Sequence, residues 1–179
     1  MADTRVSVIG CGAVGSIIAA HLARLAHADV WLYGTDAAHI AAVQAAGLRV
    51  SGAADFTAQL SVTANAAEIP RCDFSIVAVE AAGLRETIAA VAHAFDERTG
   101  VCVLGGADSA AMAAEYAKWV MRGETGITGR LAEPGRVILD DVGKTQLAPF
   151  TPSGVPMITV AAVADMLTRA GLPAGFANG

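Results

Sequence analysis

Apolar residues occur in two patterns that alternate along the first two thirds of the chain. Short, nearly continuous runs of Val, Ile and Leu predict buried strands, and apolar positions spaced by three or four residues predict helices with one buried face. This alternation is what a parallel sheet covered by helices on both faces requires. The predicted strands are residues 5–10, 29–33, 48–51, 59–63, 74–79 and 100–104, and the predicted helices are residues 13–26, 37–46, 84–95 and 109–117.

The pattern changes after residue 118. The next segment shows no helical spacing, and we interpret it as short antiparallel strands joined by turns and appended to the sheet edge, with a tight turn at Glu133-Pro134-Gly135. Helical spacing then returns in a closing helix, and the tail after it has no pattern. The expected class is α/β, a Rossmann-type doubly wound, mostly parallel sheet with an appended antiparallel meander. We expect a single domain over residues 1–179, made of a βαβ core (1–118), antiparallel strands (119–150) and a closing helix (156–171).

Composition and charge exclude several classes of protein. With 54% hydrophobic and 16% charged residues, the chain is too apolar for a disordered protein. The net charge is −5 and the twelve basic residues are scattered, which argues against nucleic acid and anionic membranes as partners. No apolar stretch reaches the roughly 18 residues of a membrane span, and the N-terminus does not resemble a signal peptide. We therefore expect a cytoplasmic protein.

The three cysteines, Cys11, Cys72 and Cys102, form no C-x-x-C pair and stand in or beside apolar segments. This placement predicts buried, reduced thiols. No cluster of His, Cys, Asp and Glu has the spacing of a metal site, so no metal is expected.

A glycine-rich turn between the first predicted strand and helix carries the clearest functional signal. Gly10, Gly12 and Gly15 form the pattern G-x-G-x-x-G. Gly10 permits a tight turn, Gly12 lets the backbone approach a pyrophosphate, and Gly15 lets the helix pack closely on the strand. The N–H groups of Ala13 and Val14 would face the phosphates, at the positive end of the helix dipole. The pattern predicts a dinucleotide site; the alternative is a turn that only packs a helix.

The second predicted strand is followed closely by Thr35 and Asp36. A carboxylate at this position in a dinucleotide-binding fold accepts hydrogen bonds from ribose hydroxyls and repels the 2′-phosphate of NADP. No Arg or Lys lies between Arg24 and Arg49 to offset it. We therefore expect NAD(H) to be favoured over NADP(H). The alternative is that Asp36 only caps the following helix.

Taken together, these segments resemble the ketopantoate reductase (2-dehydropantoate 2-reductase) family along essentially the whole chain. The stretch "VIGCGAVGSIIAAHLARL" is similar to the family's opening, "CDFSIVAVEAAGL" to its fourth strand and following loop, and "GRLAEPGRVILDDVGKT" to its antiparallel meander. The segment "VADMLTRAGLPA" is similar to its last helix before the domain boundary. The resemblance implies NAD(P)H-dependent reduction of a 2-keto acid. It also implies that the family's helical second domain, with its catalytic lysine and substrate-binding carboxylate, is absent from this chain.

The chain departs from the family pattern at three places. Glu80 stands where the family usually has a lysine, Gly105-Gly106 replace the Q-N of its L-Q-N-G, and Thr35-Asp36 stand where NADPH-using members offer an arginine. The cofactor-binding residues expected from the turn and from the resemblance are Gly10, Gly12, Ala13, Val14, Gly15, Thr35, Asp36, Val79, Glu80, Gly105 and Gly106.

No residue of the chain is expected to be catalytic. Lys118 and Lys144 are the only lysines and are expected to be solvated, as is His39, which falls on a helical pattern. Glu80 would either bond a ribose or an amide, or be a solvated acid. Two hypotheses follow: a nucleotide-binding domain of a ketopantoate-reductase-like oxidoreductase, inactive alone and using a small 2-keto acid only with a second domain, or a non-catalytic dinucleotide-binding or protein-interaction module.

The closing helix is apolar on more than one face. An exposed apolar patch of more than a few hundred Å² is rare on a monomer, so a symmetric homodimer is expected. The alternative is that the helix packs fully on its own sheet and the tail seals the remainder. The apolar residues concerned are Val155, Met157, Ile158, Val160, Val163, Met166, Leu167, Leu172 and Phe176.

Overall fold

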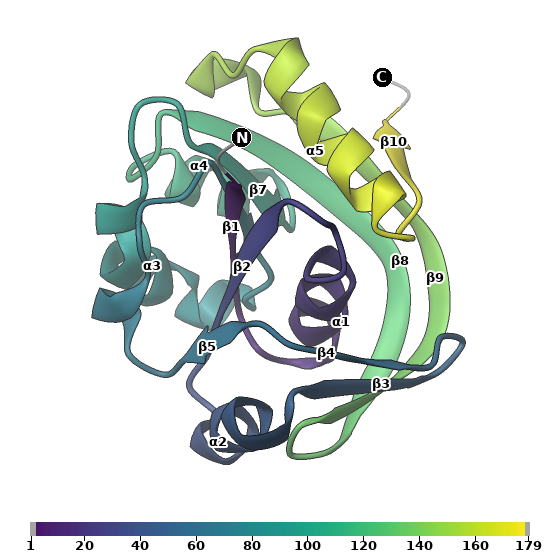
Figure 1. Cartoon of the computed structure of the whole chain (residues 1–179). Coiled ribbons are helices and arrows are strands. Elements are labelled where there is room, and N and C mark those ends of the chain that lie inside the picture. Colours follow the sequence, from purple (N-terminus) through teal and green to yellow (C-terminus); the bar gives the residue numbers. More distant parts are fainter. Residues whose placement is uncertain (1–2, 178–179) are drawn as a thin grey trace.

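The computed structural model describes residues 3–177, and these form a ten-stranded sheet with helices on both faces (Figure 1). The strand order is β4-β3-β9-β8-β7-β6-β1-β2-β5, and β10 pairs with β9. The strands are β1 (Thr4–Ile9), β2 (Ala28–Tyr33), β3 (Leu48–Gly52), β4 (Phe56–Ala58), β5 (Ser61–Thr63), β6 (Phe74–Val77), β7 (Gly100–Leu104), β8 (Trp119–Glu133), β9 (Arg136–Pro149) and β10 (Ala174–Phe176). The helices are α1 (Ala13–Leu22), α2 (Ala37–Ala46), α3 (Ala81–Val91), α4 (Ala107–Ala113) and α5 (Met157–Arg169), with short 3₁₀ turns at Ala66–Glu68, Ala92–Ala94 and Thr151–Ser153.

The parallel half of the sheet runs from β7 through β6, β1 and β2 to β5. Successive side chains of a strand point to opposite faces, so β1 serves two cores. Val8 packs in the cluster that contains Ile17 of α1, and Ile9 packs in the cluster that contains Leu84 of α3. All four are fully buried. The expected α/β class with a mostly parallel, Rossmann-type sheet is confirmed.

Residues 119–150 form one long hairpin, not several short strands. β8 has 15 residues and β9 has 14, joined by a single turn at Pro134-Gly135, and the pair curls around α1 in Figure 1. Two glycines lie inside the strands: Gly126 faces Gly143 across the hairpin, beside one of its register shifts. Register shifts and glycines let a long strand bend without ending. The prediction of short strands was therefore wrong.

The hairpin is also not at the edge of the sheet. β8 continues the parallel half by pairing with β7, and β9 pairs in parallel with β3 and β10 on its other side. On this side the sheet ends in β4, which pairs antiparallel with β3. Neither β4 nor β10 was predicted, and each has only three residues.

The closing helix packs on its own sheet, which differs from the exposed apolar face expected above. Of the apolar residues in this region, Met157, Ile158 and Phe176 are exposed, at 51%, 79% and 48% of their full area. The others are buried, namely Val155, Val160, Val163, Met166, Leu167 and Leu172. The expectation that these six side chains contribute to a large exposed apolar patch was wrong. No helix within residues 3–177 combines the length and the hydropathy of a membrane span.

The cysteines are buried and unpaired, as expected. Cys102 is inaccessible on β7, and burial raises the pKa of its thiol to about 12. A thiol in that state is a packing residue and not a nucleophile.

Candidate functional site

The three glycines of the turn between β1 and α1 meet different requirements. Gly10 has a φ of 112°, and a Cβ there would collide with the carbonyl oxygen of Ala78. A Cβ on Gly15 would collide with the carbonyl oxygen of Gly10. Gly12, by contrast, has an ordinary extended conformation (φ −67°, ψ −171°), and nothing lies within 4 Å of the position a Cβ would take. The fold thus requires glycine at 10 and 15, whereas at 12 it leaves space open.

Helix α1 begins at this open space with its backbone donors free. Gly12 is the N-cap residue, and no side chain caps the helix. The N–H groups of Ala13 and Val14 belong to the first turn, where an α-helix has no partners for its donors. Together with the helix dipole, they make the end of α1 suited to an anion.

A cleft of about 320 Å³ lies beside the turn, at the carboxyl ends of β1, β2 and β6. β1 has β2 on one side and β6 on the other, so the chain crosses to opposite sides of β1 at this point. Open α/β sheets bind ligands at such a switch point. The cleft is lined by Gly10, Cys11, Gly12, Tyr33, Gly34, Thr35, Asp36, Ala78, Val79, Glu80, Thr87 and Leu131.

Six of the eleven residues expected to bind a cofactor line this cleft: Gly10, Gly12, Thr35, Asp36, Val79 and Glu80. Ala13, Val14 and Gly15 form the adjoining first turn of α1. Gly105 and Gly106 lie apart from the cleft, because β7, which they follow, is separated from β1 by β6. The structure therefore brings the glycine turn, the end of β2 and the end of β6 together, but not the end of β7.

Some lining residues were missed by the sequence reasoning. Gly34 had a local signal, since it directly follows a predicted strand, and a Cβ there would collide with Cys11. Thr87 comes from α3, about two turns beyond Glu80. Leu131 comes from the far end of β8, and no local pattern places it beside Gly12.

Asp36 both caps α2 and lines the cleft. Its Oδ1 accepts a hydrogen bond from the backbone N–H of His39 at 3.1 Å, so the capping interpretation is confirmed. Within residues 3–177 no donor contacts its Oδ2, which stays available to a ligand hydroxyl. No Lys, Arg or His lies among the residues that line this cleft.

Glu80 also lines the cleft, directly before the start of α3. It is exposed and is the N-cap residue, but its side chain makes no capping hydrogen bond. The cleft therefore carries two carboxylates, those of Asp36 and Glu80. A small anionic substrate would meet like charge from both of them.

The basic candidates differ in where the structure places them. Lys118 and Lys144 are exposed, as expected, and Lys144 lies within strand β9. His39 is fully buried, so the expectation of a solvated histidine was wrong. It was wrong because the helical pattern does not reveal that the hairpin turn covers this face of α2.

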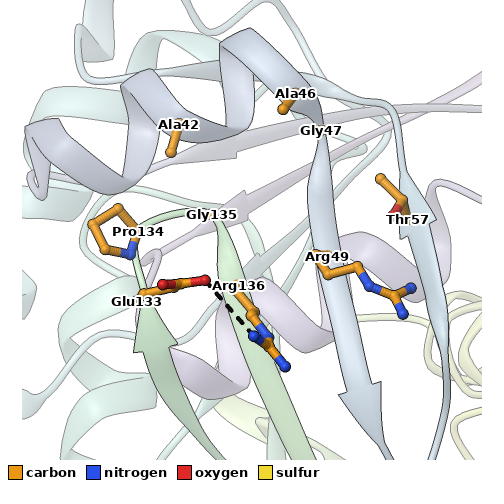
Figure 2. Close-up of a pocket in the computed structure, with 9 residues that line it drawn as sticks. All are labelled: Ala42, Ala46, Gly47, Arg49, Thr57, Glu133, Pro134, Gly135 and Arg136. Atoms are coloured by element: carbon orange, nitrogen blue, oxygen red, sulfur yellow. Dashed lines mark ion pairs between the residues drawn. The ribbon is translucent and has the colours of Figure 1, made fainter.

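A second hollow, of about 530 Å³, lies between the end of α2, the start of β3 and the hairpin turn (Figure 2). Arg49 and Arg136 are register partners on β3 and β9. Arg49 pairs with Asp55, and Arg136 lies 3.7 Å from the Glu133 carboxylate. Because each guanidinium already has a carboxylate partner, this hollow has few free cationic groups to bind an anion.

The chain resembles known proteins over nearly its whole length. A family model described as ketopantoate reductase PanE/ApbA matches residues 6–152. The 2-dehydropantoate 2-reductase from Porphyromonas gingivalis W83 is 27% identical with a TM-score of 0.84, over 98% of this chain and 64% of that one. The enzyme of the same name from Methylococcus capsulatus is 25% identical with a TM-score of 0.75, over 95% and 56%.

A structure of D-mandelate dehydrogenase with NADH and anilino(oxo)acetate is 22% identical with a TM-score of 0.84, over 98% of this chain and 57% of that one. The chain thus spans less than two thirds of the length of each of these three proteins. The resemblance inferred from the sequence motifs is confirmed, and the chain belongs to the ketopantoate reductase PanE/ApbA family.

Proposed function

We propose that this chain is the dinucleotide-binding domain of a ketopantoate-reductase-like oxidoreductase and that it binds NAD(H). The observation that carries the proposal is the open space at Gly12. Neither its backbone conformation nor any neighbouring atom requires glycine there, while the two glycines around it are both required by packing. A glycine that the fold does not need, beside an uncapped helix end, is suited to close approach by a pyrophosphate.

The residues present fit a dinucleotide in three respects. The first turn of α1 offers the N–H groups of Ala13 and Val14 to phosphate oxygens. Asp36 offers Oδ2 to ribose hydroxyls while Oδ1 holds α2, and the apolar side chains of Val79 and Leu131 line the same cleft. When a dinucleotide is bound, its nicotinamide supplies a hydride. The chain's own residues hold and orient the dinucleotide and exclude water from it.

NADH is the proposed partner over NADPH because Asp36 stands where the 2′-phosphate would lie. No cationic side chain lines the cleft to attract that phosphate. Placing a dianionic phosphate beside a carboxylate costs energy that a free 2′-hydroxyl does not.

We expect that the chain alone does not catalyse the reduction. Reduction of a ketone needs an acid that protonates the developing alkoxide. The titratable residues of the cleft are Cys11, Tyr33, Asp36 and Glu80, and both lysines lie elsewhere. We propose that a small 2-keto acid is used only when a second domain supplies the missing groups. The three buried, unpaired cysteines also favour a cytoplasmic location.

We expect the chain to bind NADH without oxidising it. Titration followed by NADH fluorescence should show saturable binding with a Kd on the order of 1–100 μM, which corresponds to about −8 to −5 kcal/mol. Addition of ketopantoate at millimolar concentration should leave the absorbance at the NADH maximum unchanged over an hour. Steady oxidation that persists in Lys118→Ala and Lys144→Ala would contradict the expected inactivity. Absence of NADH binding would overturn the proposed function and favour a protein-interaction module.

We further propose a homodimer, formed through the three large apolar side chains that remain exposed. Ile158 lies in the first turn of α5 at 79% exposure, beside Met157. Sedimentation at 50 μM should give a particle of twice 18.1 kDa, and Ile158→Glu should return it to 18.1 kDa. A glutamate there also suits the helix dipole, so the fold should not suffer. Ala162→Glu, an exposed change on the same helix, is the control. A wild-type monomer would exclude the dimer.

A further inference from the structure

His39 of α2 occupies a buried junction with α1 and the hairpin turn, and its ring makes one hydrogen bond to each of these two elements. Its ring is inaccessible to solvent. Nδ1 lies 2.9 Å from the backbone nitrogen of Gly135 in the hairpin turn, and Nε2 lies 3.0 Å from Oγ of Ser16 in α1. The Ser16 Oγ lies in turn 3.0 Å from the carbonyl oxygen of Cys11, in the glycine turn. A continuous chain of hydrogen bonds thus joins the tip of the hairpin to the turn that starts α1.

The direction of each hydrogen bond follows from the groups involved. A backbone N–H can only donate, so Nδ1 of His39 accepts from Gly135 and carries no proton. The neutral ring then carries its proton on Nε2 and donates to Ser16, whose own hydroxyl proton is free to go to the Cys11 carbonyl oxygen. Burial lowers the pKa of His39, with the Asp36 carboxylate opposing this in part, which agrees with a neutral ring.

The end of this chain bears on the cleft through one peptide unit. The carbonyl of Cys11 and the N–H of Gly12 belong to the same planar, trans peptide, so they point in opposite directions. Ser16 is fully buried, and it holds the Cys11 oxygen toward the interior. The N–H of Gly12 is thereby directed away from the interior. Because Gly12 lines the cleft, its N–H faces that side.

The other end is anchored by close packing. Figure 2 shows Pro134 and Gly135 beneath Ala42 of α2. A Cβ on Gly135 would lie 3.0 Å from the Cβ of Ala42, so the turn lies directly against the helix. His39 does not itself line the cleft. The chain of hydrogen bonds that it belongs to ends at Cys11, which lines the cleft together with Gly12.

We infer that His39 is a positioning residue for the dinucleotide site: through Ser16 it orients the Cys11–Gly12 peptide so that the Gly12 N–H faces the pyrophosphate. This inference rests on the proposed function. Asp36 adds to the arrangement from the same helix, since its Oδ1 accepts from the His39 backbone N–H. The hairpin turn, the start of α2 and the glycine turn are therefore set relative to one another by one imidazole.

The test uses variants that keep one hydrogen bond of the ring and lose the other. The side-chain amide of His39→Gln can reach as Nε2 does and preserve the donor to Ser16, whereas His39→Asn reaches only as far as Nδ1 and preserves the acceptor for Gly135. We expect the Kd for NADH to rise about tenfold in His39→Asn and in Ser16→Ala, as loss of one buried hydrogen bond does, and less than threefold in His39→Gln. The double variant Ser16→Ala/His39→Asn should bind NADH as weakly as either single variant, because both break the same chain of hydrogen bonds.

Thr99→Ala is the matched control for loss of stability. Thr99 is buried, and its hydroxyl donates to the carbonyl oxygen of Cys72 at 2.8 Å, on β7's side of the sheet and outside the cleft. It should lower Tm as much as Ser16→Ala does, yet leave the Kd for NADH unchanged. Wild-type affinity in both Ser16→Ala and His39→Asn, or additive losses in the double variant, would overturn the inference while the proposed function stood. A wild-type chain that does not bind NADH would overturn both.

Discussion

Replacing Gly12 by valine should abolish NADH binding and leave the fold intact. The Cβ of residue 12 meets nothing within 4 Å, and the backbone there is in an extended conformation open to any residue. The added methyl groups would therefore fill the space beside the uncapped end of α1 without disturbing the protein. If that space receives the pyrophosphate, we expect the Kd to rise at least 100-fold, which is about 2.7 kcal/mol.

The control for this change is Gly83→Val. Gly83 lies in α3, is exposed, and its Cβ position is equally free of neighbours. It does not line the cleft. A valine side chain there should change Tm by no more than a degree or two and should leave the Kd for NADH unchanged. Wild-type affinity in a folded Gly12→Val protein would show that the turn only packs α1 on the sheet.

The elements around the turn could be predicted because their signals are local. The run before Gly10, the glycine spacing and the apolar positions of α1 all lie within about 20 consecutive residues. The same is true of β2, whose last residue, Tyr33, leads directly into Gly34, Thr35 and Asp36. Six expected residues consequently share one cleft in the structure.

The hairpin could not be predicted because its shape depends on distant partners. Gly126 and Gly143 look like turn residues in isolation, yet they face each other in a continuous pair of strands. Only the pairing of β8 with β7 and of β9 with β3 makes extended backbone favourable through them. Without that pairing, sequence reasoning does not place Leu131 in the cleft.

His39 illustrates a different limit. The histidine at position 39 was expected to be solvated, because it falls on a helical pattern and has no acid partner at a telling spacing. Its burial depends on Gly135, 96 residues away, which covers the ring and donates to it. The compensating signal was Ser16, a polar residue in an otherwise apolar helix segment, which indicates that a buried partner must be near.

The charge of Asp36 should set the preference between the two dinucleotides. We expect the wild-type chain to bind NADH about tenfold more tightly than NADPH, since a carboxylate within a few Å of the 2′-phosphate costs about 1–4 kcal/mol at effective dielectric constants between those of water and a protein surface. A variant of Asp36 isolates the effect of its charge only if it keeps the hydrogen bond that caps α2. Asp36→Asn preserves an oxygen for the His39 N–H while removing the charge.

In parallel titrations, Asp36→Asn should therefore narrow the difference between NADH and NADPH with no change in Tm. Asp36→Ala should narrow it equally but lower Tm by a few degrees, as loss of a cap worth about 1 kcal/mol does. Asp36→Arg should reverse the order and favour NADPH. Asp108→Asn, which removes a charge from the first turn of α4 outside the cleft, should leave the ratio of the two affinities unaltered. Equal affinities of the wild-type chain for NADH and NADPH would mean that Asp36 only caps α2 and does not select between the two dinucleotides.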